Sequence, residues 1–394
     1  MMPIVLPSYA RAPVSFERGE GPYLFSADGR KYLDFTSGVA VVSLGHANPR
    51  LIKALTDQAQ RLWHCSNLFE VEGQKRVAQK LIDHSFADTV FFCNSGTEAV
   101  EAAVKVARKY QAASGHPEKY RVIACGGSFH GRTMAMLAAA GNEKYLAGFG
   151  PPAEGYDHVA FGNLNEMRAA VTAETAAVLV EPVQGEGGLT TPPEGYLKGL
   201  RQLCDEFGLM LIYDEVQSGM GRTGKLFAHQ WEAGAEPDVL ATAKALGGGF
   251  PVGACLATEK AAAGMVAGTH GSTFGGNPLA MAVAEEVIDI MTEPGFFDHV
   301  NRMGRAFRTK LDRLVKAHPT IFAETRGRGL LIGLKCVVPN TEMVTRLRAA
   351  GLLAVGAGEN VLRLMPPLNI TEAQLDDGVA IIDAVARDWG HAPH

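Results

Sequence analysis

Short, almost wholly apolar runs alternate with amphipathic segments through the middle of the chain. The apolar runs are Thr89–Cys93, Arg121–Cys125, Ala176–Val180 and Leu209–Tyr213, and each predicts a strand. Helical patterns follow the first three runs, at Thr97–Ala113, Thr133–Ala140 and Glu194–Phe207. Buried strands separated by helices favour a largely parallel sheet covered on both faces. Ligands bind beyond the carboxyl ends of the strands in such a sheet, so the residues after each run are the candidates for chemistry.

The two ends of the chain have a different pattern. Tyr23–Phe25 and Lys31–Phe35 flank a turn at Asp28-Gly29 and predict a hairpin. The later pattern is α+β, with helices expected at Pro278–Met291, Phe296–Ala317 and Glu372–Arg387 and strands at Ile321–Thr325 and Gly329–Lys335. We therefore expect an α/β protein with a large domain at residues 56–285. Residues 1–55 and 286–394 are expected to form a smaller α+β domain.

The composition is that of a globular protein, because 47% of the 394 residues are hydrophobic and 20% are charged. A formal net charge of −5 gives no basic surface for nucleic acid. No apolar run reaches the roughly 18 residues that span a bilayer, and the start MMPIVLPSYARAP lacks the pattern of a secretory signal. The six cysteines are scattered, without a CxxC pair. We expect a reduced, cytoplasmic protein that acts on a small molecule, with no membrane or nucleic-acid partner.

The most specific chemistry lies in an acid and a lysine. Asp214 directly follows the strand Leu209–Tyr213, and Lys244 lies beside the glycine run 247–249. Most lysines are solvated surface charges, but this one lies between apolar segments, where burial would lower the pKa of its amine. Such an amine forms a Schiff base with an aldehyde, and a carboxylate from a neighbouring strand end keeps a pyridine nitrogen protonated. The pair therefore points to an enzyme that uses pyridoxal 5′-phosphate.

Two further loops could hold a phosphate. Ser95, Gly96 and Thr97 join a strand to a helix, where hydroxyl groups and free N–H groups form an anion cradle. The same residues would also serve as an ordinary helix cap. Thr273, in the glycine loop before the helix at Pro278, could supply another hydroxyl or merely cap that helix.

The loops after the strands at 121–125 and 176–180 carry aromatic and charged residues. Phe129 could lie against a flat ring or pack in the core, and Arg132 could bind a carboxylate or remain solvated. His130 has no partner at metal-ligand spacing, so we favour a packed or hydrogen-bonded histidine. Glu181 and Glu186 could be solvated loop charges, but they follow a strand at the same sheet edge as Asp214. That position favours a role in the site.

The segment Gly219–Gly224 matches GxGxxG, the pattern of dinucleotide-binding loops. In those proteins the glycines open a helix directly after a strand. Here residues 214–217 intervene and the residues that follow are a weak helix start, so we expect a turn. A nucleotide-binding dehydrogenase, or a non-catalytic binding protein, is therefore the least favoured interpretation.

Taken together, these segments resemble the class III (ornithine-type) aminotransferases. The resemblance runs in order along nearly the whole chain, through ERGEGPYLFSADGRKYLDF, LGHANP, NSGTEAVEAAVKVAR, SFHGRT, EPVQGEGG, YDEVQSGMGRTGK, AKALGGGFPVGA, HGSTFGGNPLA, RGRGLLIGL and VLRLMPPL. It implies a pyridoxal phosphate-dependent transferase of fold type I, with a mostly parallel mixed sheet in the large domain. It also implies a homodimer whose active sites are shared between subunits.

The resemblance assigns roles to single residues. Lys244 would carry the cofactor and move the proton between substrate and cofactor. Asp214 would pair with the pyridine nitrogen, Gln217 would reach the ring hydroxyl and Phe129 would stack on the ring. The phosphate would be held by Ser95, Gly96 and Thr97, joined by Thr273 of the neighbouring subunit.

Within the family, the chain is most similar to the members that act on N-acetylornithine. Arg132 would bind the carboxylate of that substrate and the side-chain carboxylate of glutamate, while Arg363 would bind the α-carboxylate of glutamate. Glu186 would pair with Arg363 whenever the donor is not glutamate, which avoids a buried unpaired arginine. Ornithine-specific members carry a tyrosine where this chain has Val39, so its absence favours an acylated substrate.

The resemblance thus implies transfer of the δ-amino group of N-acetylornithine to 2-oxoglutarate, a step of arginine biosynthesis. The reaction would run as two ping-pong half-reactions through pyridoxamine phosphate. Relatives that act on succinylornithine or succinyl-diaminopimelate share the motifs, so the acyl group stays open. A 4-aminobutyrate-type ω-transaminase is the other alternative.

Overall fold

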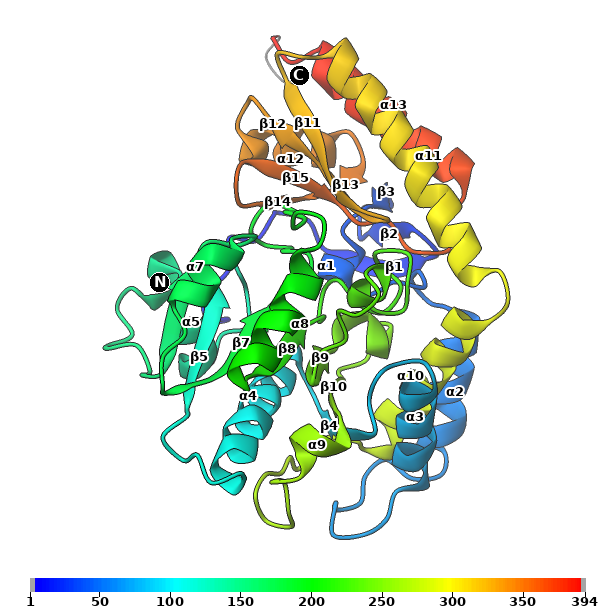
Figure 1. Ribbon diagram of the computed structural model, residues 1–394. Helices are drawn as coiled ribbons and strands as arrows, with labels where there is room; N and C mark the ends of the chain where they lie inside the picture. Colours follow the sequence, from blue (N-terminus) through cyan, green and yellow to red (C-terminus); the bar gives the residue numbers. More distant parts are fainter. Residues whose placement is uncertain (1–3, 391–394) are drawn as a thin grey trace.

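The computed structural model describes residues 4–390, and its elements form three sheets (Figure 1). The largest has seven strands: β4 (Thr89–Cys93), β5 (Arg121–Cys125), β6 (Tyr156–Val159), β7 (Thr175–Val180), β8 (Met210–Asp214), β9 (Val239–Thr242) and β10 (Gly253–Ala257). Their order is β4-β10-β9-β8-β7-β5-β6. β10 pairs antiparallel with both β4 and β9 and the other pairs are parallel, so the predicted mostly parallel mixed sheet is confirmed.

Both faces of this sheet are covered, as the apolar runs predicted. Alternate residues of β7 and β8 pack into two separate clusters, because successive side chains of a strand point to opposite faces. Ala177, Leu179 and Ile212 pack with α4 (Gly96–Ala113). Val178, Val180 and Leu211 pack with α8 (Tyr196–Phe207) on the other face. Shorter helices complete these layers: α5 (Met134–Ala140), α6 (Glu143–Leu146), α7 (Leu164–Ala169) and α9 (Glu259–Ala262).

The other two sheets combine the ends of the chain. The hairpin β2 (Tyr23–Ser26) and β3 (Lys31–Asp34) is confirmed, and it pairs with β1 (Phe16–Glu20) and with β13 (Leu352–Leu353). The third sheet is antiparallel, with β11 (Phe322–Arg328), β12 (Leu331–Cys336), β15 (Val361–Leu364) and β14 (Val355–Ala357). The predicted domain boundaries at residues 55 and 285 stay a prediction. The two ends of the predicted smaller domain, residues 1–3 and 391–394, lie outside the described residues.

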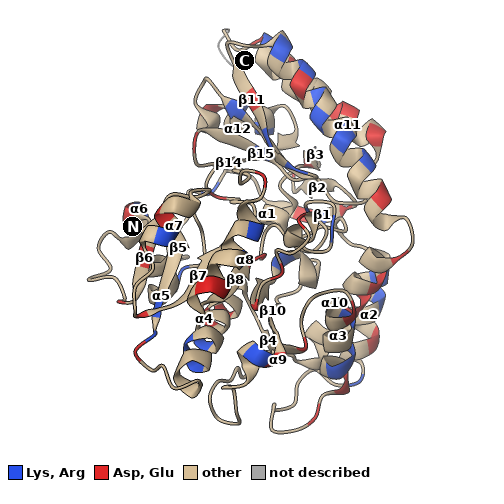
Figure 2. Cartoon of the chain, in the orientation of Figure 1, with Lys and Arg blue, Asp and Glu red and all other residues tan. Residues whose placement is uncertain are grey.

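Longer helices lie beside the three sheets. They are α2 (Pro49–Ala59), α3 (Glu72–Asp83), α10 (Pro278–Thr292), α11 (Phe296–Ala317), α12 (Asn340–Ala349) and α13 (Glu372–Arg387). Both α2 and α3 pack on α10, and α11 lies along α13 (Figure 1). Figure 2 shows Lys, Arg, Asp and Glu interspersed along α11, whereas the strands of the large sheet carry few charges. Within residues 4–390, no helix is both long and apolar enough to cross a membrane.

Candidate active site

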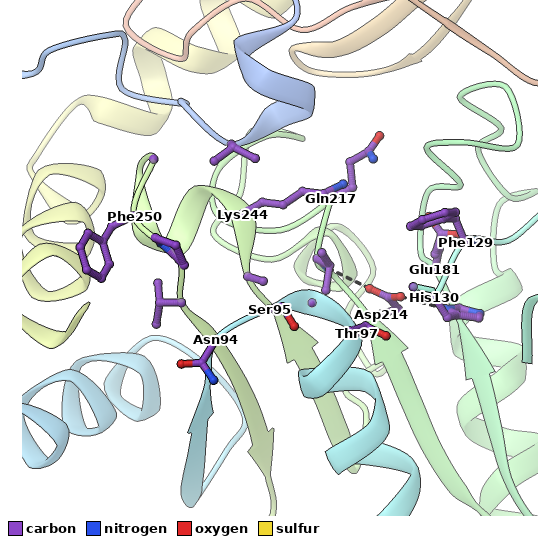
Figure 3. Close-up of a pocket in the computed structure, with 18 residues that line it drawn as sticks. Asn94, Ser95, Thr97, Phe129, His130, Glu181, Asp214, Gln217, Lys244 and Phe250 are labelled. Atoms are coloured by element: carbon purple, nitrogen blue, oxygen red, sulfur yellow. Dashed lines mark hydrogen bonds and ion pairs between the residues drawn. The ribbon is translucent and has the colours of Figure 1, made fainter. Parts of the chain in front are cut away.

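A cavity of about 320 Å³ lies at the carboxyl ends of β4, β7, β8 and β9 (Figure 3). Seven of the eleven predicted site residues line it: Ser95, Gly96, Thr97, Phe129, Asp214, Gln217 and Lys244. They come from segments up to about 150 positions apart in sequence, and the parallel strands bring them to one edge of the sheet. The remaining four, Arg132, Glu186, Thr273 and Arg363, lie outside this lining.

The N-terminus of α4 faces the cavity and has the form of an anion cradle. Ser95 is the N-cap of the helix, and its hydroxyl donates to the Glu98 carboxylate at 2.8 Å. Gly96 is required there, because a Cβ atom would lie 2.7 Å from a methyl carbon of Val216. The first N–H groups of a helix lack helical acceptors and attract anions. The helix cap and the cradle, weighed as alternatives from the sequence, are therefore two functions of one segment that suits a phosphate group.

Asp214 is buried at the cavity and is held by two donors. Its Oδ2 lies 2.8 Å from His130 Nδ1, and its Oδ1 accepts the backbone N–H of Val216 at 3.0 Å. The predicted hydrogen-bonded histidine is confirmed, while His130 Nε2 is buried without a partner among the described residues. Across residues 4–390, no cluster of three or more His, Cys, Asp or Glu side chains could hold a metal ion. The fixed carboxylate suits the protonated nitrogen of a pyridine ring.

Glu181 also lines the cavity and is buried there, which excludes the alternative of a solvated loop charge and agrees with the favoured position in the site. Its carboxylate accepts the backbone N–H groups of Phe129 at 2.8 Å and Gly185 at 3.1 Å, which ties together the two loops after β5 and β7. Burial, followed by repulsion from Asp214, raises the pKa of Glu181 to about 7. The position of Glu181 directly after β7 was the signal in the sequence for a role in the site, because the cavity forms at the carboxyl ends of the strands.

Lys244 begins the 3-10 helix η2 (Lys244–Gly247) directly after β9. Its backbone has a φ of +44°, a left-handed conformation that costs a non-glycine residue about 1–2 kcal/mol. Burial lowers the pKa of its amine, and the charge of nearby Glu186 acts in the opposite direction. Strain held at a desolvated lysine is typical of a functional residue. A solvated surface lysine is therefore excluded.

Arg363 and Glu186 meet in a bidentate ion pair. The distances are 2.5 Å from Nη1 to Oε1 and 3.0 Å from Nη2 to Oε2. Arg363 Nη1 also donates to Gln217 Oε1 at 3.0 Å, which links the pair to the cavity lining. The carbonyl oxygen of Gln217 is thereby occupied, so its amide N–H groups are the donors that remain for a ligand.

Two predicted residues lie apart from the cavity of this chain. Arg132 is exposed, with its guanidinium 3.8 Å from the ring centre of Tyr145 and 5.2 Å from that of Phe129. Thr273 is exposed on the loop before α10. The alternative that Thr273 caps this helix is wrong, because the side chain of Asn277 accepts the N–H of Ala280. Nothing in the sequence pattern had singled out Tyr145.

The segment Gly219–Gly224 forms turns and opens no helix, as expected. Its Arg222 is completely buried and forms no ion pair within residues 4–390, although the charge of Asp34 acts on it. The guanidinium donates to Pro366 O at 2.5 Å, Ser43 Oγ at 2.7 Å and Leu330 O at 3.3 Å. This loop therefore joins the large sheet to the two smaller ones instead of binding a dinucleotide.

Comparison with known proteins agrees with this geometry. A family model described as Aminotransferase class-III matches residues 5–386. An acetylornithine aminotransferase of Mesorhizobium japonicum is 54% identical over 98% of this chain and 96% of its own length. A succinylornithine transaminase/acetylornithine aminotransferase of Pseudomonas aeruginosa is 45% identical over 97% of this chain and 95% of its own. The ornithine aminotransferase of Toxoplasma gondii, solved with partial occupancy of PLP at its active site, has a TM-score of 0.93. It is 33% identical, over 97% of this chain and 92% of that one.

Proposed function

Since the chain belongs to the class III aminotransferases, which depend on pyridoxal 5′-phosphate, we propose that it transfers the δ-amino group of N-acetylornithine to 2-oxoglutarate. The products would be N-acetylglutamate semialdehyde and glutamate, in a step of arginine biosynthesis. The observation that carries this choice is the ion pair of Glu186 with Arg363 near Lys244. Relatives named for acetylornithine, more than half identical over nearly the whole chain, support it.

The cavity fits the cofactor. The cofactor supplies an aldehyde and an electron-accepting ring, on which amino groups are exchanged between two substrates. We assign its phosphate to Ser95, Gly96 and Thr97 and its ring nitrogen to Asp214. Phe129 would lie against the ring. Within residues 4–390, His130 Nε2 is buried without a hydrogen-bond partner, so the polar atoms around Asp214 are not all satisfied there.

Lys244 is assigned the proton transfers. The lowered pKa of its amine raises the neutral fraction near pH 7, so the amine can accept a proton from the substrate carbon and return it. Its left-handed backbone directs the side chain into the cavity (Figure 3). Gly249, in the neighbouring glycine run, lines the same cavity, and its missing side chain leaves open space there.

The arginines would let one pocket accept two unlike substrates. Arg132 would bind the single carboxylate of N-acetylornithine, whose other end is a neutral amide. Arg363 stays paired with Glu186 during that half-reaction, so no buried cation is left alone. Glutamate carries a second carboxylate, which would replace Glu186 on Arg363. The exposure of Glu186, at 29% of its side chain, leaves it room to move.

We further propose a homodimer that brings Thr273 of one subunit to the phosphate site of the other. Large apolar side chains are exposed around that loop: Trp63 at 65%, Leu68 at 88%, Phe69 at 69% and Phe274 at 60%. Asn67 ties the two segments together by donating to the carbonyls of Ser272 and Gly275. Apolar patches of this kind mark association surfaces. We also propose a cytoplasmic location, supported by six unpaired cysteines.

A substrate panel tests the proposal. The purified, cofactor-loaded protein is assayed with 2-oxoglutarate and N-acetylornithine, N-succinylornithine, N-succinyl-diaminopimelate, ornithine or 4-aminobutyrate. We expect the highest kcat/KM with N-acetylornithine and bleaching of the cofactor absorbance by glutamate. The succinylated compounds are included because the Pseudomonas aeruginosa relative is named for both acyl groups. A preference for ornithine or 4-aminobutyrate contradicts the proposal.

A further inference from the structure

Four consecutive residues of the N-terminal segment adopt a left-handed conformation. Ser37, Gly38, Val39 and Ala40 have φ angles of +45°, +61°, +63° and +63°. The turn is closed by its own hydrogen bonds, from Ala40 N to Thr36 O at 3.0 Å and from Val41 N to Ser37 O at 2.8 Å. Only glycine adopts this conformation without strain, and a β-branched valine adopts it least readily. Surrounding contacts must therefore hold the turn in place.

Asp34 is the residue that holds the entrance of the turn. Its Oδ1 accepts the N–H and hydroxyl of Thr36 at 2.8 and 2.6 Å and the N–H of Ser37 at 3.1 Å. Its Oδ2 lies 2.8 Å from His46 Nε2. Burial acts to raise the pKa of Asp34, but the hydrogen bonds from His46 and Thr36 leave it below its ordinary value. The carboxylate therefore stays ionised and caps the turn with charge-assisted hydrogen bonds.

The other side of the turn is attached to the strand that carries Arg363. The Ser37 hydroxyl donates to Met365 O at 2.7 Å, and Met365 N donates to Phe35 O at 2.6 Å. Val39 packs against the cluster that contains Leu189 and Met365. The turn is thus fixed between Asp34 on one side and the residues just after Arg363 on the other.

The turn presents one side chain to the active-site cavity. Val41, directly after the left-handed residues, lines the cavity together with Lys244. Among the lining residues it is the one that comes from the N-terminal segment. The blue ribbon of that segment passes above Lys244 in Figure 3. A relaxed, right-handed backbone at residues 37–40 would rotate this side chain out of its place, because each φ would change sign.

We propose that Asp34 is a positioning residue for the amino donor, which holds the left-handed turn and through it keeps Val41 at the wall of the cavity. The apolar surface of Val41 then confines the aliphatic chain of the donor beside Lys244. This inference deepens the proposed function and rests on it only for the choice of donor.

The test compares Asp34→Ala with Asp28→Ala. Asp28 accepts the Ser26 hydroxyl and the Arg30 N–H in the hairpin turn of the same sheet, so its removal deletes a hydrogen-bonded carboxylate at an exposed position outside the left-handed turn. We expect Asp34→Ala to raise KM for the donor about tenfold, with kcat and the dissociation constant of the cofactor within about twofold of wild type. That tenfold change corresponds to about 1.4 kcal/mol. Asp28→Ala should leave all three values within about twofold.

A second readout reports the turn itself. Amide hydrogen exchange, followed by mass spectrometry on the cofactor-free protein, should become faster at residues 37–42 in Asp34→Ala and remain unchanged in Asp28→Ala. Ala40→Gly removes the strain at one position of the turn. The double variant Asp34→Ala/Ala40→Gly is compared with Ala40→Gly alone. In that background the loss of donor affinity caused by Asp34→Ala should be smaller by at least about a third, and part of the exchange protection should return.

Three results would overturn the proposal: a donor KM in Asp34→Ala within twofold of Asp28→Ala, unchanged exchange at residues 37–42, or no rescue by glycine. If Asp34→Ala does not fold, Asp34→Asn replaces it. Asparagine keeps an acceptor for the N–H groups of Thr36 and Ser37 but loses the charge, so the same changes are expected at smaller size. If the wild-type protein prefers another donor, the proposed function fails, and the same variants are compared with that donor.

Discussion

Replacing Glu186 with glutamine should shift the enzyme toward glutamate. The proposed reaction requires the α-carboxylate of glutamate to displace Glu186 from Arg363, so glutamate binding includes the cost of opening that ion pair. N-acetylornithine leaves the pair intact. Glu186→Gln removes the charge of the competitor and should therefore favour glutamate selectively.

The size of the effect follows from the burial of the pair. Breaking a fully buried pair costs about 3–5 kcal/mol, and breaking an exposed pair costs about 0–1 kcal/mol. The Arg363 side chain is 2% exposed and the Glu186 side chain is 29% exposed, so solvent screens one partner only. We therefore expect opening of the Glu186–Arg363 pair to cost about 1.5 kcal/mol, which corresponds to a change of roughly tenfold in the affinity for glutamate.

The assay is a stopped-flow single-turnover measurement of each half-reaction, followed by the absorbance of the cofactor. We expect kcat/KM for glutamate, divided by kcat/KM for N-acetylornithine, to rise about tenfold in Glu186→Gln. The control is Glu194→Gln, an exposed residue after the same strand with the same change of charge. A ratio in Glu186→Gln within twofold of that control would refute the switch.

Three further changes test other parts of the site. Lys244→Ala should lower the rate of amino transfer at least about 10³-fold. It should not lower the free energy of unfolding, because the variant removes a desolvated amine. A loss below tenfold in product formation would contradict the role of Lys244. The pKa of Glu181 is raised from 4.5 to about 7, so its stabilising contribution is complete below about pH 4.5 and is lost as the pH rises through 7. Glu181→Gln should therefore be more stable than wild type by about 3 kcal/mol at pH 8 but not at pH 4.5. Urea denaturation of the cofactor-free protein at both pH values measures this, and a difference that does not change with pH speaks against it. Arg222→Met should lower the free energy of unfolding by about 3 kcal/mol, because Ser43 Oγ and two buried carbonyl oxygens lose their donor; thermal unfolding within a degree of wild type would rule this out.

Local pattern was sufficient for most of the regular elements. The strands at Thr89–Cys93 and Arg121–Cys125 and the helices at Phe296–Ala317 and Glu372–Arg387 have the predicted bounds. Apolar runs of five residues predict strands and long amphipathic repeats predict helices. Neighbouring positions alone show whether one face or the whole segment is buried.

Several short or polar strands were missed. The strands β13 and β14 have two and three residues, and they exist because β3 and β15 supply the hydrogen bonds. β1 reads FERGE, a mostly polar segment that is recognised as a strand only through its pairing with β2. β2 and β15 are sequence neighbours of their partners, whereas β3 lies far from β13 in the chain. Segments this short or this polar carry no apolar alternation of their own.

The candidate site divides in the same way. The residue types and their order along the chain predicted Lys244, Asp214 and the cradle at Ser95–Thr97, because each follows an apolar strand and strand ends meet at one edge of a sheet. The contact of His130 with Asp214, 84 positions apart, and the burial of Glu181 between two loops came from the folded chain. So did the pairing of Glu186 with Arg363, 177 positions apart, which the family resemblance implied but no spacing could demonstrate.

The sequence by itself determined the chemistry: a lysine and an acid at strand ends, with glycine and hydroxyl residues at the start of a helix. Only the tertiary structure decided how these groups are charged and held. Burial and the proximity of other charges set the pKa values of Glu181 and Lys244, and contacts from Asp34 and Met365 hold the left-handed turn at residues 37–40. Desolvation and strain depend on which distant segments meet, and that information is distributed over the whole fold.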